Sequence, residues 1–163
     1  MCEEEISAWI ADRIPEGWFE GPPEVDCDGD EILVVGPLDR PAAASRQGES
    51  DAARIQRFRE STREQRMRIA QAVERRFGRR VSWGASIGGE RHLFTTLSIP
   101  VMTRLRLPER QALDTLVGAG VARSRSDALA WCVRLVAKHE AEWIAELREA
   151  LVRVGELRRK GPA

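Results

Sequence analysis

The chain has 163 residues, 42% hydrophobic and 32% charged, which is enough apolar material for a folded core and argues against disorder throughout. No apolar run approaches the roughly 18 residues that a membrane span needs, and the acidic N-terminus does not resemble a signal or transit peptide, so we expect a cytoplasmic protein. The net charge is zero, but residues 1–50 carry 13 acidic and 3 basic residues whereas residues 51–163 carry 13 acidic and 23 basic ones, which hints at a polyanionic partner or at contact between the two parts.

The first 98 residues have the pattern of a compact α+β domain. Apolar residues at helical spacing predict a helix over residues 3–14, and Pro15 ends it. The pair at residues 28–29, Asp-Gly, lies between short extended runs and predicts a tight hairpin, with residues 32–35 as an inner strand.

The second half of this domain repeats the order of one helix and two strands. Residues 36–50 are rich in turn formers and small residues and predict a loop. A long helix is expected over residues 51–77, with Gly78 as its C-terminal stop. Residues 81–98 predict a second hairpin, which turns at residues 88–89, Gly-Gly.

A second domain is expected over residues 99–163, and it begins with an alternating run at residues 99–107. Such alternation predicts a strand, which Pro108 ends while starting a helix. One strand face would carry Val101, Thr103, Leu105 and Leu107, and the opposite face Met102, Arg104 and Arg106.

Two helices should follow this strand. Residues 109–117 predict a short helix, and residues 118–123 a turn. Ser124 is expected to cap the next helix, with Asp127 three residues later as a variant of the capping box. Its apolar face continues through a C-terminal stripe, either a coiled-coil seam or a surface that packs on the first domain, formed by Trp143, Ile144, Leu147, Leu151 and Val154.

The order of strand, proline, short helix, turn and serine-capped helix resembles the ribbon-helix-helix family, which includes the Arc and MetJ repressors. The segments that carry the resemblance are VMTRLRLP at 101–108, LDTLVGAGVARSRSDAL at 113–129 and CVRLV at 132–136, within residues 97–137. The resemblance implies a homodimer in which two strands pair into an antiparallel ribbon that enters the major groove of DNA.

By the same resemblance, the outward strand residues read bases and the start of the second helix binds phosphate. The base readers would be Met102, Arg104 and Arg106, and the phosphate contacts Arg123, Ser124, Arg125 and Ser126. Arginine can make bidentate hydrogen bonds to guanine, and a helix N-terminus offers free N–H groups to an anion.

An arginine-rich stretch in the first domain leaves two interpretations open. Residues 54–80 contain ten arginines and three glutamates. They could form a solvated helix stabilised by ion pairs such as Glu64 with Arg68 and Glu60 with Arg63. Alternatively they form a second nucleic-acid or phosphate-ligand surface, for which Arg57, Arg68 and Arg75 are the candidates.

No pattern predicts catalysis, a metal or a cofactor. The acidic run at residues 26–31 has its glycine in the wrong place for a calcium loop. The three cysteines, and His92 and His139, lack the spacing of a zinc site, and no nucleophile has a recognisable base. We therefore expect a non-enzymatic protein without cofactor.

Together these patterns favour a transcriptional regulator, a repressor that binds double-stranded DNA as a homodimer or higher homo-oligomer. The first domain would sense a small-molecule effector or assemble dimers. A rival hypothesis is an RNA- or nucleotide-binding protein that uses the arginine-rich helix, with the C-terminal unit serving dimerisation alone. A third is an antitoxin that neutralises a partner protein.

Overall fold

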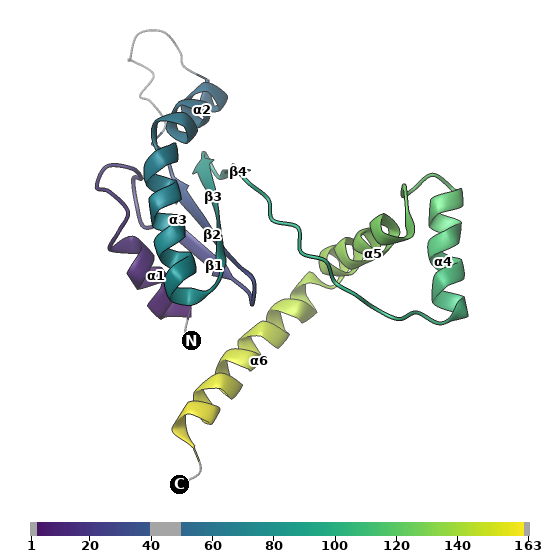
Figure 1. The fold of residues 1–163 in the computed structure, drawn as a ribbon. Helices are drawn as coiled ribbons and strands as arrows, with labels where there is room; N and C mark the ends of the chain where they lie inside the picture. The colour runs from purple at the N-terminus through teal and green to yellow at the C-terminus, as the bar shows by residue number, and fades with distance from the viewer. Residues whose placement is uncertain (1–2, 40–49, 162–163) are drawn as a thin grey trace. The chain divides into compact units, whose positions relative to one another are not determined.

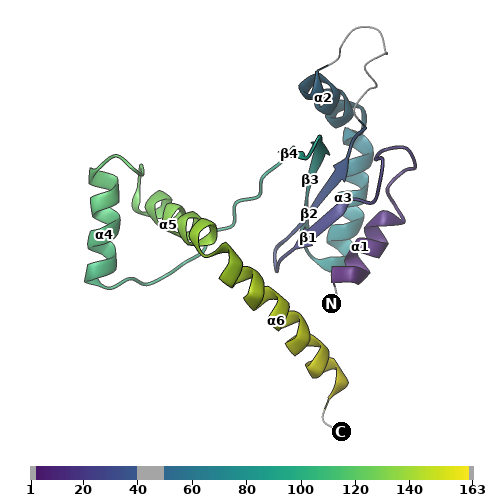
Figure 2. The ribbon, with the colours of Figure 1, turned by 180° about the vertical axis from the view of Figure 1, so that it is seen from behind.

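The computed structural model describes residues 3–39 and 50–161, which divide into two compact units at residues 100 and 101 (Figures 1 and 2). Within the described residues there are six helices and a four-stranded mixed sheet, so the expected α+β class is confirmed. Most of the loop predicted at residues 36–50 lies outside the described residues. Its first two positions belong to a strand instead, because β2 continues through Gly36 and Pro37.

The sheet of the N-terminal unit joins two hairpins through a parallel pair. Its strands lie in chain order, β1 (Glu24–Cys27), β2 (Glu31–Pro37), β3 (Arg80–Ile87) and β4 (Glu90–Leu93). Both predicted hairpins are present as antiparallel pairs, whereas β2 and β3 run parallel, with Val34 opposite Trp83. A parallel pair needs a crossover connection, which the helices between β2 and β3 provide.

Local chemistry explains both hairpin turns. The Asp28 carboxylate accepts hydrogen bonds from the backbone N–H groups of Asp30 at 2.9 Å and Glu31 at 2.7 Å, and these bonds lower the pKa of its carboxyl group. Gly88 and Gly89 adopt positive φ angles of 60° and 88°. A two-residue turn of this kind requires positive φ at both central residues, which glycine tolerates without steric cost.

Helices α1 (Glu3–Ala11) and α3 (Arg63–Phe77) lie on the same face of the sheet (Figures 1 and 2). Gly78 ends α3 with φ of 68°, as predicted. The core between helices and sheet contains Ile6, Ile10, Ile32, Val34, Leu38, Ile55, Ile69, Val73, Trp83, Ala85, Ile87 and Phe94.

The long helix predicted over residues 51–77 is interrupted at Thr62, so that α2 (Asp51–Ser61) and α3 are separate helices. The Thr62 hydroxyl donates to the Phe58 carbonyl at 2.6 Å and accepts from Arg66 Nε at 3.0 Å. Arg66 also donates through Nη2 to the Arg59 carbonyl at 2.6 Å. The Phe58 carbonyl also accepts the Thr62 N–H at 3.1 Å, so side chains supplement the backbone hydrogen bonds at the end of α2.

The C-terminal unit contains α4 (Leu107–Gly118), α5 (Arg125–His139) and α6 (Ala141–Lys160). The predicted C-terminal helix is divided at Glu140, whose φ and ψ are −112° and 30°. Residues 101–106 are extended but pair with no other described strand, so the strand predicted at 99–107 does not form within this chain. None of the described helices has the length and apolar character required to cross a membrane.

Replacement of Thr62 by valine should destabilise the N-terminal unit by about 1–3 kcal/mol, because it removes two hydrogen bonds and leaves the buried Nε of Arg66 without its acceptor. Urea unfolding followed by circular dichroism measures the change. Ser61→Ala is the matched control, since the Ser61 hydroxyl is exposed and its bond to the same Phe58 carbonyl is longer, at 3.3 Å. Equal stability of the parent and Thr62→Val would contradict this explanation of the helix break.

Candidate nucleic-acid interface

The extended segment before α4 places its arginines on the surface and one leucine against the helices. Arg104 and Arg106 are exposed, and Met102 is 97% exposed. Leu105, between the two arginines, is half-buried against a core that includes Leu113. Its carbonyl accepts a hydrogen bond of 2.7 Å from Arg110 Nη1, which fastens the segment to α4.

Three positions predicted to face inward differ from that expectation. Val101 is 85% exposed, Leu107 is 58% exposed, and Thr103 is also exposed. Val101 and Thr103 lie in a segment that has no second strand beside it among the described residues, and Leu107 is the first residue of α4. Of the four, Leu105 is the one that packs against the core of α4 and α5. The apolar side of this segment is therefore largely uncovered.

The start of α5 has the predicted cap. Ser124 Oγ accepts from the Asp127 N–H at 3.2 Å, and Asp127 Oδ2 accepts from the Arg123 N–H at 3.0 Å. Ser124 and Ser126 are exposed, and the Arg123 side chain is 96% exposed. The N–H groups of Arg125 and Ser126, in the first turn, have no acceptor inside the helix and can bind an anion.

The Arg125 side chain differs from its predicted role as a phosphate contact. Its Nε and Nη2 donate to the two carboxylate oxygens of Asp114, each at 2.6 Å, and this bidentate pair joins α4 to α5. The hydrogen bonds between these two side chains raise the pKa of Arg125 and lower the pKa of Asp114. A phosphate would have to compete with this carboxylate for the guanidinium, whereas the Arg125 backbone N–H stays available.

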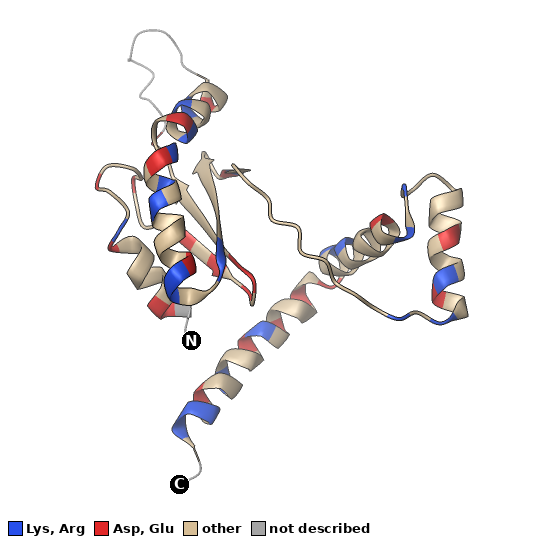
Figure 3. Cartoon of the chain, viewed as in Figure 1, with Lys and Arg blue, Asp and Glu red and all other residues tan. Residues whose placement is uncertain are grey.

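The arginines proposed as a second basic surface are exposed but lie on two helices. Positively charged residues lie on both helices (Figure 3). The break at Thr62 separates Arg57, on α2, from Arg68 and Arg75, on α3. Arg68 forms the predicted ion pair with Glu64, at 2.5 Å. Glu60 instead accepts a hydrogen bond from Gln56 at 2.5 Å.

Three arginines that face a cavity were not among the residues predicted from the sequence. Arg59, Arg63 and Arg66 line it, together with Gln56 and Ala70. The intervals between these positions are three or four residues, which is the spacing of one helix face. This spacing continues across the break at Thr62. It is the feature of the sequence from which a shared arginine face could have been predicted.

A broad apolar surface is exposed on the C-terminal unit. The predicted inner face of α5 is buried only toward its start, because Leu129 and Cys132 contact the core while Val133 is 63% exposed and Val136 is 50% exposed. No residue of α6 is buried. Its exposed apolar residues are Trp143, Leu147, Leu151, Val152, Val154 and Leu157.

Removal of the α5 cap should lower stability without changing the surface charge. Ser124→Ala is expected to cost about 1 kcal/mol because the Asp127 N–H loses its acceptor. Chemical denaturation of the full chain, with helix content as the signal, tests this. Ser126→Ala, two residues further into the same turn, should change stability by less than half as much, and equal effects of the two substitutions would show that the cap does not stabilise α5.

Comparison with known proteins assigns both units to described families of domains. Residues 4–93 match the N-terminal domain of the Rv1265-like proteins, and residues 106–158 match the Mb1296 C-terminal domain. No solved structure shows a significant match.

Three curated relatives are each 56% identical over 157 residues, which cover 94% of this chain and 69% of the relative. They are described as uncharacterized protein Mb1296 of Mycobacterium bovis and uncharacterized proteins MT1303 and Rv1265 of Mycobacterium tuberculosis. This identity, together with a family match over more than half of the chain, shows that the protein belongs to the family of Rv1265-like proteins.

Proposed function

We propose that this protein is a sequence-specific, double-stranded DNA-binding regulator of transcription, acting as a repressor, and that its C-terminal unit is a ribbon-helix-helix dimer. The observation that carries the proposal is the placement of Arg104 and Arg106 on the surface on either side of Leu105, which packs on α4 and α5. An extended segment with this alternation can present two cations to a groove while the leucine between them stays against a core.

The proposed dimer is supported by the amount of apolar surface that the single unit leaves exposed. Among the described residues of this unit, its core has three buried members, namely Leu113, Ala122 and Ala128. Val101 and much of α5 remain exposed. An isolated strand has no stability of its own, and pairing with the same segment of a second copy would satisfy its backbone and cover Val101.

In the proposed complex the paired strands lie in the major groove and the starts of the two α5 helices bind the DNA backbone. A two-stranded ribbon fits the width of this groove, and each arginine can recognise a guanine through its O6 and N7 atoms. Phosphate would be held by the first N–H groups of α5 and by the Arg123 side chain, which is 96% exposed and whose Nε lies 3.8 Å from Asp127 Oδ2, farther than the 2.6 Å of the Arg125–Asp114 bonds. Because Asp114 engages Arg125, we assign this clamp chiefly to the backbone and to Arg123.

The arginines and the leucine of the extended segment should have separable roles. Arg104→Ala and Arg106→Ala should each weaken binding to a selected operator by roughly 1–3 kcal/mol, which is the discrimination that one bidentate arginine–guanine pair provides, with little change in the melting temperature. Leu105→Ala should destabilise the dimer by roughly 2–5 kcal/mol and lose DNA binding as a consequence of unfolding. Fluorescence anisotropy with the operator and a scrambled duplex, paired with thermal melts, measures both effects.

Arg148→Ala is the matched control, because it removes one exposed positive charge from α6, outside the proposed ribbon. It should leave the ratio of operator to scrambled binding unchanged. If Arg104→Ala and Arg106→Ala bind the operator as tightly as the parent chain, the ribbon does not read bases. The DNA-binding role would then fall to the N-terminal unit or be abandoned in favour of the RNA- or nucleotide-binding alternative.

A further inference from the structure

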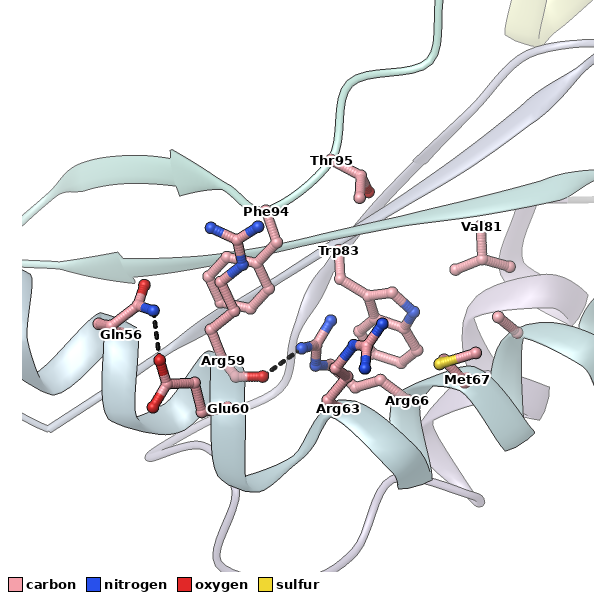
Figure 4. A pocket seen from close by; sticks show the side chains of 11 residues that line it. Gln56, Arg59, Glu60, Arg63, Arg66, Met67, Val81, Trp83, Phe94 and Thr95 are labelled. Carbon is pink, nitrogen blue, oxygen red and sulfur yellow. Dashed lines mark hydrogen bonds between the residues drawn. The ribbon is translucent and has the colours of Figure 1, made fainter.

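A cavity of about 560 Å³ lies within the N-terminal unit (Figure 4). It is bounded by one side of α2 and α3 and by two aromatic residues, Trp83 on β3 and Phe94 directly after β4. Its helical wall includes Arg59, Arg63 and Arg66, and its opposite wall includes Trp83 and Phe94. The volume is in the range of sites that bind small organic molecules. Positive charge and aromatic rings thus face the same space.

The three arginines of this cavity carry more positive charge than their neighbours neutralise. In the described part of the chain, none of them forms an ion pair with a carboxylate. The carboxylate in the lining, that of Glu60, is bound by Gln56. Burial, together with repulsion from Arg59 and Arg63, lowers the pKa of Arg66 to about 10. An anion in the cavity would relieve this repulsion.

The structural role of Arg66 uses part of its hydrogen-bonding capacity. Its guanidinium donates to Thr62 Oγ1 and to the Arg59 carbonyl, which are two bonds among the five N–H groups of an arginine. Arg66 is 7% exposed, and its guanidinium carbon lies 4.8 Å from the centroid of the Phe94 ring. Support of the helix break therefore explains only part of the placement of Arg66. It does not explain why Arg59 and Arg63 also line the cavity.

The aromatic wall has an unused hydrogen-bond donor. Trp83 is 4% exposed, and its Nε1 is buried without an acceptor among the described residues. In Figure 4 this nitrogen is directed toward Met67 and Val81, which also line the cavity. A buried N–H without an acceptor is destabilising, and a ligand atom that accepts this bond would remove the cost.

We propose that this cavity binds a small organic anion that joins a carboxylate or phosphate group to a flat aromatic ring. Arg59, Arg63 and Arg66 hold the anionic group, and the ring lies against Trp83 and Met67 with an acceptor atom for the indole N–H. Arginine suits both parts of such a ligand, because it binds planar oxyanions in bidentate fashion and stacks on aromatic faces. All the lining residues belong to the N-terminal unit, so this inference stands independently of the proposed DNA binding.

Titration calorimetry and intrinsic tryptophan fluorescence of the full chain test the ligand class with matched probes. The ring anions are 1-naphthoate and adenosine monophosphate, and their uncharged counterparts are 1-naphthol and adenosine; inorganic phosphate supplies the charge without a ring. At least one ring anion should bind about tenfold or more tightly than its uncharged counterpart and than phosphate. The ring anion that binds more tightly shows whether the ligand class is an aromatic acid or a nucleotide.

Variants then test the cavity. Arg59→Gln and Arg63→Gln alter exposed side chains, so the fold should persist while affinity for the ring anion falls about tenfold in each. Arg80→Gln removes the same charge from an exposed position on β3 outside the cavity and should bind as the parent does. Trp83→Phe keeps a ring but removes the N–H, and should weaken binding to a smaller extent.

Three outcomes would overturn the inference. Neither ring anion binds the parent chain at millimolar concentration; or Arg59→Gln and Arg63→Gln bind as tightly as Arg80→Gln; or inorganic phosphate alone binds as tightly as the ring anions. The last result would show an anion site without a role for the aromatic wall.

Discussion

The small core of the C-terminal unit is the constraint on which the proposed function depends. Leu113, Ala122 and Ala128 are its buried members among the described residues, and two of these are alanines. The N-terminal unit, by contrast, encloses aliphatic and aromatic side chains between helices and a sheet. Burial of apolar area is the main favourable term in folding, so the C-terminal unit needs additional cover for Val101 and for α5. Pairing with a second copy would supply this cover. It would also bring together two sets of the exposed arginines of the extended segment, so the proposed recognition of DNA would depend on the same association that stabilises the unit.

The arginines of this chain show how the environment of a side chain determines which interactions remain open to it. Arg104 and Arg106 are exposed on an extended segment, where a cation is free to meet a polyanion. Arg125 is held by both oxygens of Asp114 and serves to join two helices. Arg66 is buried beside two further arginines at a cavity, where its charge is costly without an anion. A count of arginines along the sequence treats all of these as one basic surface, although the fold places them in three different environments.

Local features of the fold could be predicted from the sequence, and non-local ones could not. The turns at Asp28 and Gly88, the Ser124 cap and the stop at Gly78 follow from the chemistry of neighbouring residues, and the structure contains them. The parallel pairing of β2 with β3 joins segments about fifty residues apart, so no local pattern encodes it. The break at Thr62 was not predicted because the helical periodicity of the sequence continues through it. The ion pair of Arg125 was not predicted because its partner, Asp114, lies on another helix.

Whether the C-terminal unit folds as a pair is tested most directly by sedimentation equilibrium combined with denaturant unfolding over a wide range of chain concentrations. We expect a dimer at micromolar concentration, with an unfolding midpoint for α4 and α5 that rises with protein concentration, because association and folding are coupled. A monomer at micromolar concentration, with α4 and α5 fully formed and a midpoint independent of concentration, would contradict this coupling.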